Sequence, residues 1–399
     1  MHNSVRRMAS LSVTKAKFTP RYYDVGVNIT DPMFSGDYRG KKHHRNDMLD
    51  VLQKAYRHHV KDVLLTGSSL TESQRTIQLV QSFKQETQFS QGIEIPQLYS
   101  TVGVHPCSVL EFEQSTSPEE HIINLKKVIH EGLELGIVKA FGEIGLDYDR
   151  LHYTPVDKQL TYFKMQLELA TEFDLPLFLH MRAACDDFVS ILQPYIEDGR
   201  LQNKNLLVHS FTGDKLELGK LMNLETSPSN KRGYKIYISM NGASLRDQAT
   251  LDAIPAIPLD RLMIETDSPW CEIKRTHPSY KYLTRSPSAF YPDESENYDL
   301  LTCKSELQEL LNLGGGGKAS KKGNVSKVTL FDFLPIPIVK SERFDSFKYQ
   351  QFFVDTPLIK SRNEPCLIGL VGEVVAKVMN IEPETLIDAC YVNSKAVFG

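Results

Sequence analysis

The stretch from Ile137 to His180 reads IVKAFGEIGLDYDRLHYTPVDKQLTYFKMQLELATEFDLPLFLH, and it decides the fold. It begins with a short apolar run that ends on an acid, Glu143, and it finishes with another that ends on a histidine. Between them, the segment Asp157–Phe173 places its large apolar residues at three- and four-residue spacing, which is typical of an amphipathic helix. The stretch is therefore predicted to form one strand–helix–strand unit, with a polar side chain where each strand ends.

The same unit repeats along the chain. Runs of this length that are apolar almost throughout indicate strands buried on both faces, as in a parallel sheet. The eight runs are Tyr22–Asn28, Val60–Thr66, Leu98–His105, Ile137–Glu143, Pro176–His180, Asn205–His209, Tyr234–Asn241 and Arg261–Asp267. The segments between them carry helical patterns; Asp47–Arg57 is one, and Ser117 followed by Pro118 is typical of a helix N-terminus.

Eight strand–helix steps within residues 22–275 predict an α/β fold, the (β/α)8 or TIM barrel, which takes about 250 residues. The alternative is an open, doubly wound sheet. Such a sheet usually has a G-x-G-x-x-G pattern after its first strand, and this sequence has none.

Residues 283–360 interrupt the repeat and are predicted to be an insertion after strand eight. The barrel domain then comprises residues 22–282 and 361–399. An insertion at this point leaves from the catalytic face of a barrel, so it is expected to form either a lid over the site or a surface loop. The sequence predicts a helix at Ser305–Leu313, strands at Val328–Val339 and Gln350–Val354, and helices at Glu364–Met379 and Glu384–Cys390.

The composition is that of an ordinary globular protein, with 41% hydrophobic and 24% charged residues among 399. No run approaches the roughly 18 consecutive apolar residues of a membrane-spanning helix. The formal net charge of −4 gives no general attraction to nucleic acid. A polyanion would therefore have to be bound locally, by a metal ion or a basic patch.

The six cysteines include no C-x-x-C pair, which argues against a disulfide scaffold or a thiolate zinc site and fits a reducing compartment. Residues 1–21 are basic and lack the apolar core of a secretory signal, so they are predicted to be a flexible tail, with a mitochondrial presequence as the alternative. We expect a cytoplasmic protein, with nuclear or mitochondrial access left open.

Four of the strand-end residues are strong metal ligands, namely Glu143, His180, His209 and Asp267. The ends of parallel strands converge at the mouth of a barrel, so these residues are expected to meet around one centre. Two imidazoles and two carboxylates suit zinc, manganese or magnesium, as one ion or as two bridged by Glu143. Asp147 is expected to orient a ligand or to cap the following segment.

Four further residues are candidates for substrate binding. His105 is expected to be an additional ligand, a donor to a substrate oxygen, or a partner of a loop carbonyl. Arg182, two residues past His180, meets either an anionic substrate or a neighbouring acid. Asp24 and Asn28 lie on the same side of the first strand by its period of two, and either could reach the site.

These motifs resemble the signatures of the TatD-type metal-dependent deoxyribonucleases, in their eukaryotic branch. The matching pieces are FGEIGLD with Glu143, LPLFLH with His180, VHSF with His209, ETDSPW with Asp267, GVHP at 103–106 and RNEP at 362–365. The resemblance covers about residues 22–282 and 360–399 and leaves out the tail and the insertion.

The resemblance implies a barrel of the amidohydrolase superfamily that hydrolyses DNA phosphodiester bonds with divalent cations, commonly magnesium. Cutting from the 3′ end is typical and internal cutting occurs, in DNA breakdown during cell death or in repair. It implies that Glu143 bridges the ions, that His180 and His209 bind one ion, and that Asp267 binds the other. Asp267 or Glu143 is then the acceptor of a proton from water.

The sequence departs from the family pattern at the first strand. Many members carry a His-x-His pair there, and the matching positions here are Gly26 and Asn28. This form resembles the eukaryotic branch, and it implies that the ion beside Asp267 is held less tightly. The alternatives are a small-molecule amidohydrolase on the same barrel and a scaffold without activity.

Overall fold

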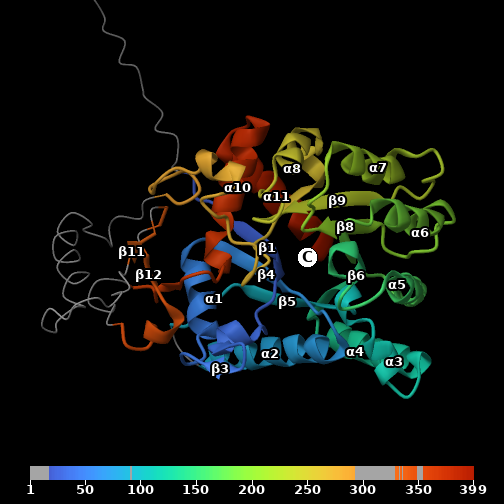
Figure 1. Ribbon diagram of the computed structural model, residues 1–399, viewed down its shortest axis with the longest axis horizontal. Coiled ribbons are helices and arrows are strands. Elements are labelled where there is room, and N and C mark those ends of the chain that lie inside the picture. The colour runs from blue at the N-terminus through green and yellow to red at the C-terminus, as the bar shows by residue number, and fades with distance from the viewer. Residues whose placement is uncertain (1–17, 90–91, 293–328, 332, 335, 348–353) are drawn as a thin grey trace, which may run out of the picture.

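The computed structural model describes residues 18–89, 92–292, 329–331, 333–334, 336–347 and 354–399. Its centre is a sheet of eight parallel strands, surrounded by helices (Figure 1). Every one of the eight strands expected from the apolar runs is present. The strands, in sheet order, are β1 Tyr22–Val27, β4 Val60–Leu65, β5 Gln97–Val102, β6 Val138–Asp147, β7 Leu177–Arg182, β8 Asn205–His209, β9 Lys235–Met240 and β10 Leu262–Ile264.

The sheet closes into a barrel where β1 meets the segment that follows β10. Val27 forms a parallel bridge with Ser268, and the backbone N–H of Asp267 donates to the carbonyl of Gly26 at 2.8 Å. The backbone N–H of Asn28 donates to the carbonyl of Ser268, also at 2.8 Å. The predicted (β/α)8 barrel is confirmed, and the open doubly wound sheet is excluded.

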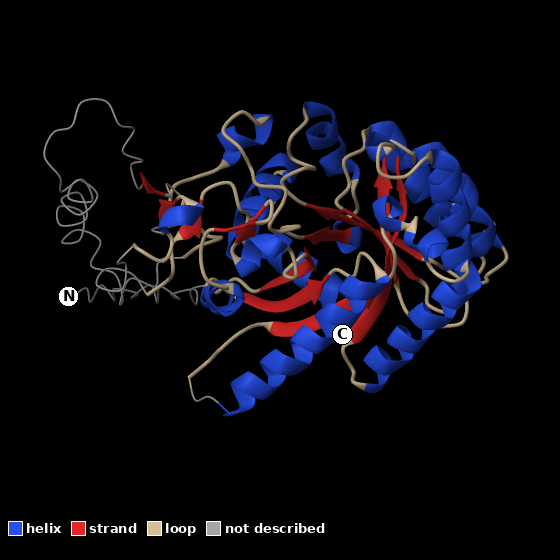
Figure 2. Cartoon of the chain, turned by 60° about the horizontal axis from the view of Figure 1, so that its bottom comes forward, coloured by secondary structure: helices blue, strands red, loops and turns tan. Residues whose placement is uncertain are grey.

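The helices form an outer ring around the strands, which is clearest when the molecule is tilted (Figure 2). Each barrel strand is followed by helical structure because the intervening segments are amphipathic. The cap expected at Ser117 is confirmed, since its hydroxyl accepts a hydrogen bond from the N–H of Glu120. The helices are α1 Met48–Arg57, α2 Leu70–Phe89, α3 Glu111–Gln114, α4 Pro118–Glu134, α5 Val156–Ala170, α6 Cys185–Glu197, α7 Lys215–Thr226, α8 Gln248–Ala253, α10 Ile368–Met379 and α11 Pro383–Phe398.

The barrel interior toward the amino ends of the strands is filled by apolar side chains from alternate strand positions. The end of α11 covers this core at the amino ends of the strands. Val397 and Phe398 pack against the core, and the ring centroid of Phe398 lies 6.2 Å from that of Tyr23. The interior is therefore a packed core and not a channel, so only the carboxyl ends of the strands are left to form a site.

Four predicted strand ends are wrong by two residues or more, among them that of β5, which ends at Val102 and not at His105. The strand that carries Glu143 does not end there, because β6 and β7 stay paired as far as Asp147 and Arg182. The last barrel strand ends at Ile264, before Asp267, whose φ of 52° places it in a left-handed turn. These differences move candidate residues relative to their strands, but each side chain remains on the carboxyl side of the barrel.

The described part of the insertion lies against the barrel beside α1 and α10 (Figure 1). The predicted strand Val328–Val339 is in fact two antiparallel strands, and a third pairs in parallel with the second. Ser341 lies 2.7 Å from a ring nitrogen of His43, which follows a short hairpin that the sequence did not predict. The strands of the small sheet are β11 Thr329–Leu330, β12 Pro337–Val339 and β13 Leu358–Ile359, and those of the hairpin are β2 Asp37–Tyr38 and β3 Lys41–Lys42.

Buried charges fix the chain where it returns from the insertion to the barrel. The guanidinium of Arg362 donates to both oxygens of Asp47, at 2.9 and 2.6 Å, and to Glu364 at 2.9 Å. Lys54 donates to the other oxygen of Glu364 at 2.8 Å. All four side chains are buried, so each charge depends on the others for compensation. The RNEP motif thus joins α1 to the start of α10.

Three expectations lie wholly or mostly outside the described residues: the helix at 305–313, the strand at 350–354 and the flexible tail at 1–21. Within the described residues, no helix is both long and apolar enough to cross a membrane. The five cysteines in that part of the chain, Cys107, Cys185, Cys271, Cys366 and Cys390, are free thiols.

Candidate metal centre

Three adjacent strands bring the central residues of the site together. His180 of β7 is paired in register with His209 of β8, and Glu143 lies on the neighbouring β6. Side chains on alternate positions of a strand point to the same face, so all three reach the space above the barrel core. The ring of Phe178 stacks on His209, with 4.5 Å between centroids, and forms part of the floor.

One oxygen of Glu143 is the meeting point. Its Oε1 lies 2.6 Å from Nε2 of His209 and 2.8 Å from Nδ1 of His180. Nε2 of His105 lies 3.5 Å from the same oxygen. Burial opposes ionisation of Glu143, but the imidazoles of His209, His105 and His180 hold the pKa of this carboxyl well below its usual range.

Each of the two central imidazoles has a buried carboxylate on its other side. Nε2 of His180 lies 3.2 Å from Asp147, and Nδ1 of His209 lies 3.4 Å from Glu265. Despite the opposing effect of burial, these acids and Glu143 raise the pKa of both histidines. Carboxylates of this kind orient imidazole ligands in metal sites and fix which nitrogen faces the ion.

Glu265 was not predicted from the sequence as a site residue. It is fully buried, and its carboxylate accepts hydrogen bonds from Ser239 at 2.9 Å and from Asn241 at 3.1 Å. The only available signal was its position two residues before Asp267, in a run that is otherwise apolar. Its partners come from other strands, and no local pattern identifies them.

His105 is held in one tautomer by the backbone. Its Nδ1 accepts a hydrogen bond from the N–H of Cys107 at 3.0 Å, so the ring proton is on Nε2, the atom that faces Glu143. Burial lowers the pKa of His105 to about 4, so the ring is neutral at pH 7. His105, Cys107 and Asp147 also lie close together, but burial raises the pKa of the Cys107 thiol to about 12, which makes it a poor ligand.

Asp267 lies on the other side of the site, in the turn where the barrel closes. Asn28 donates to its Oδ1 at 2.8 Å, and the thiol of Cys271 lies 3.1 Å from its Oδ2. Burial raises the pKa of Asp267 to about 6, opposed by His209 and reinforced by Glu265 and Glu143. Asp267 thus interacts with His209 and Glu143 through charge, while its carboxylate hydrogen-bonds with Asn28 and Cys271.

The two candidates on the first strand have different surroundings. Asn28 reaches the site through its hydrogen bond to Asp267. Asp24 lies deeper and is fully buried, and its oxygens accept from the N–H of Thr266 at 2.9 Å and from its hydroxyl at 2.6 Å. Asp24 thus holds β1 to the segment after β10, and the structure does not bring it into the cluster.

The remaining candidate, Arg182, is at the rim. It ends β7, its side chain is one quarter exposed, and its Nε donates to Asp149 at 2.7 Å. It meets the neighbouring acid that was one of its two expected partners, and it keeps a face toward solvent.

The donor set fits a divalent cation. Four acids, Glu143, Asp147, Glu265 and Asp267, lie at least half buried in this region, and burying so much negative charge requires a compensating positive charge. The raised pKa of His180 and His209 is a consequence of the same field. Glu143 and His180 offer ligand atoms in this cluster, and His105, whose Nε2 carries its proton, lies beside them as a donor. Imidazole nitrogens with carboxylate oxygens are ligands for zinc or manganese, and the carboxylates also suit magnesium.

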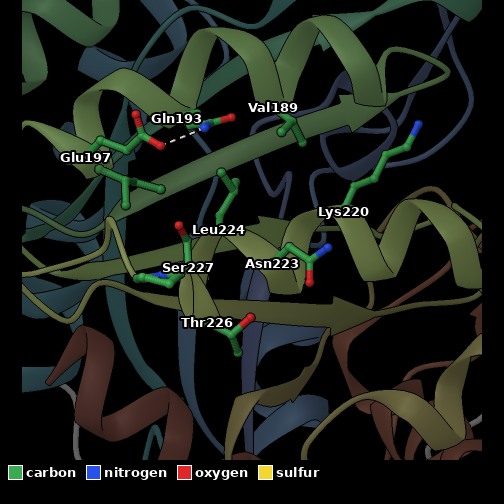
Figure 3. Close-up of a pocket in the computed structure, with 10 residues that line it drawn as sticks. Val189, Gln193, Glu197, Lys220, Asn223, Leu224, Thr226 and Ser227 are labelled. Atoms are coloured by element: carbon green, nitrogen blue, oxygen red, sulfur yellow. Dashed lines mark hydrogen bonds between the residues drawn. The ribbon is translucent and has the colours of Figure 1, made fainter.

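A hollow lies on the outside of the barrel, between α6 and α7 (Figure 3). It has a volume of about 460 Å³, and its edge carries Glu197, which accepts a hydrogen bond from Gln193 at 2.7 Å. None of the residues that line it belongs to the candidate metal centre. We therefore place the site at the mouth of the barrel.

Comparison with known proteins gives a consistent result. The profile of the family described as "TatD related DNase" matches residues 23–290. A Saccharomyces cerevisiae protein named "Deoxyribonuclease Tat-D" is 32% identical, over 98% of this chain and 94% of its own length. A "3'-5' ssDNA/RNA exonuclease TatD" of Escherichia fergusonii is 31% identical, over 62% of this chain and 79% of its own length.

Solved structures agree with these sequence matches. An "uncharacterized amidohydrolase" from Saccharomyces cerevisiae superposes with a TM-score of 0.70 at 34% identity, covering 95% of this chain and all of that one. A "hydrolase TatD family protein" from Entamoeba histolytica has a TM-score of 0.67 at 24% identity, covering 95% of this chain and 98% of that one, a likeness that bears on the fold alone.

Proposed function

This chain belongs to the TatD-related DNase family, and we propose that it is a divalent-metal-dependent deoxyribonuclease that shortens single-stranded DNA from its 3′ end. The observation that carries the proposal is the cluster of Glu143, His180 and His209 at the barrel mouth, with a buried acid behind each imidazole. A cation held there by these residues and Asp267 would polarise the phosphate and activate water.

The chain's own residues have distinct tasks in this proposal. Asp147 and Glu265 orient His180 and His209. Asp267 accepts the proton of the attacking water, because Glu143 is already engaged by the imidazoles of His180 and His209. His105 donates from Nε2 to a phosphate oxygen, and Arg182 meets the charge of the strand at the rim.

We propose Mg²⁺ as the ion, since it retains several waters and is often held by one or two carboxylates together with substrate phosphates. The two imidazoles favour Mn²⁺ or Zn²⁺ by comparison. Asn28 offers only an amide, already bonded to Asp267, where a histidine would offer a stronger ligand. A second ion beside Asp267 would therefore depend on the DNA phosphate for part of its coordination.

The test is cleavage of single-stranded DNA labelled at the 5′ end, with Mg²⁺, Mn²⁺ or Zn²⁺ and with chelator. We expect a ladder of shortened 5′-labelled products that chelator abolishes. Glu143→Gln and Asp267→Asn should each lower kcat at least 100-fold. Glu197→Gln, at the outer hollow, is the matched control and should keep full activity. Failure of the unmodified protein to cleave DNA with any of these ions would refute the proposal, and undiminished activity of Glu143→Gln would reveal a contaminating nuclease.

A further inference from the structure

A hollow next to the metal centre is built partly by the insertion. It has a volume of about 740 Å³ and is bounded by the loop at 271–275, by β12 and β13, and by the start of α10. A hollow of this size is in the range of ligand-binding sites. The parts contributed by the small sheet lie beyond residues 23–290, the range that the family profile matches.

The lining of this hollow is strongly basic. Lys274, Arg275, Lys340 and Lys360 all line it and are exposed, and Glu272 is the single acid among its lining residues. Burial raises the pKa of Glu272, and the charges of Lys274 and Lys360 act against that rise, so both ammonium groups lie near this carboxyl. In a chain with a net charge of −4, this concentration of positive charge is a local feature that suits a polyanion.

The hollow adjoins the candidate metal centre, because two of its lining residues contact the segment that carries Asp267. Cys271 lines it, and its thiol lies 3.1 Å from Oδ2 of Asp267. Asn363 also lines it and donates to the carbonyl of Thr266, the residue before Asp267. The side chain of Trp270, between the two regions in sequence, is 52% exposed. A strand whose scissile phosphate lies at the metal centre would therefore have the basic hollow as its neighbour.

Aromatic side chains add to the basic ones. Tyr280, Phe331 and Phe333 line the hollow and pack edge to face, with ring centroids 5.5 Å apart in each pair. Tyr280 and Phe331 are half-buried, so each keeps part of its ring accessible. Basic side chains that follow a backbone, combined with aromatic rings on which bases stack, are the usual means of binding single strands.

We propose that this hollow, which we call the basic cleft, binds the part of a single-stranded DNA substrate that extends away from the scissile phosphate. The proposal rests on the proposed nuclease function and assigns to the insertion the task of holding the strand. Lys274, Lys340 and Lys360 contact phosphates, and the aromatic rings contact bases. Binding along the cleft lowers KM for long strands and leaves the chemical step unchanged.

The experiment compares a Lys274→Ala/Lys340→Ala/Lys360→Ala variant with a Lys204→Ala/Lys231→Ala/Lys235→Ala variant. The control removes three exposed lysines at or just before the starts of β8 and β9, at the opposite end of the barrel. On a long single strand, we expect the cleft variant to raise KM about tenfold, because three phosphate contacts are lost. Its kcat, and its hydrolysis of a dinucleotide too short to reach the cleft, should equal those of the control.

The salt dependence of binding gives a second readout, which does not need catalysis. Trp270 is the sole tryptophan of the chain, so its fluorescence reports DNA binding beside the cleft. The slope of log affinity against log salt should fall by about 2 in the cleft variant, which is about 0.7 for each lost phosphate contact with a single strand. Lys340→Glu alone should weaken binding if the triple variant is unstable.

Two results would overturn the proposal: equal KM values for the cleft and control variants on the long strand, or an equal rise in KM on the dinucleotide. Failure of the nuclease function is distinguishable from both. In that case no variant cleaves DNA with any metal, while binding followed through Trp270 still shows whether the cleft holds a single strand.

Discussion

At the scale of single residues, the site depends on side chains that touch no substrate. Glu265 is the clearest case, because it lies behind His209 and is itself held by Ser239 and Asn241. It also occupies the space beside Gly26, where a Cβ atom would lie 2.8 Å from its Oε2. Glu265 thus fills the space that a side chain at position 26 would need.

We predict that Gly26→Ala lowers kcat at least tenfold, because the new methyl group displaces Glu265 from His209 and outer carboxylates of this kind affect activity by about 10–100-fold. Steady-state kinetics on DNA measures the effect. Gly219→Ala is the matched control, since a Cβ there meets nothing within 4 Å. Full activity in Gly26→Ala would show that the position of Glu265 is not critical.

Asp24 gives a prediction about stability and pH. Burial raises the pKa of this carboxyl well above its usual value, although hydrogen bonds from Thr266 and Gly26 act in the other direction. The folded protein therefore holds this proton more tightly than the unfolded chain, and the free energy of unfolding falls as the pH rises from about 4 through the folded pKa.

Asp24→Asn cannot ionise, so it escapes this loss. We expect the Tm values of the variant and the unmodified protein to approach each other near about pH 4, and the variant to be the more stable near about pH 8. Thermal unfolding across that range, with chelator present, measures both. A variant that is less stable at every pH by a constant amount would show that Thr266 requires a carboxylate.

At the scale of elements, α11 lies far from the metal centre and stabilises the barrel core. The end of α11 closes the barrel from below, and Phe398 is 1% exposed in the interior core. Phe398→Ala should lower the free energy of unfolding by about 3–5 kcal/mol, since a buried ring is replaced by a cavity.

Denaturation in urea measures that loss. Val392→Ala on the same helix is the control, because Val392 is 55% exposed, and it should change stability by no more than about 0.5 kcal/mol. Nuclease activity per folded molecule should survive in both variants, because α11 packs at the end of the barrel opposite the metal centre. Loss of activity in folded Phe398→Ala would show that the two ends are coupled.

At the scale of the whole molecule, a cation at the barrel mouth joins strands that are separate in sequence. Glu143, His180 and His209 come from β6, β7 and β8, so an ion bound to the folded state and not to the unfolded chain stabilises the barrel. At an ion concentration 100 times Kd, the gain should be about 2.7 kcal/mol.

Thermal unfolding with Mn²⁺ and with chelator tests this prediction. The unmodified protein should have the higher Tm with the ion, and Glu143→Gln should lose most of that difference. An equal shift in the two proteins would place the stabilising ion outside the candidate centre.

The sequence predicts the long, locally encoded elements well and the short strands poorly. The eight strands were predicted because each is a continuous apolar run, and most of the helices because their apolar residues repeat at helical spacing; both signals are local. The small sheet was predicted poorly, since its strands are only two or three residues long and the partner of Ile338 in β13, Leu358, lies 20 residues further along the chain. The hairpin at 37–42 was missed for a related reason, because its strands have two residues each.

The sequence by itself determined the barrel and, through the order of its strand-end residues, the set of Glu143, His180, His209 and Asp267 as candidate ligands. Only the tertiary structure decided which acids stand behind the imidazoles, that Glu265 fills the space beside Gly26, and that the insertion forms a basic cleft next to Asp267. The physical reason is distance along the chain. Hydrophobic periodicity is encoded among neighbouring residues, whereas hydrogen bonds, steric contacts and the walls of a cleft join residues that become neighbours only when the barrel has closed.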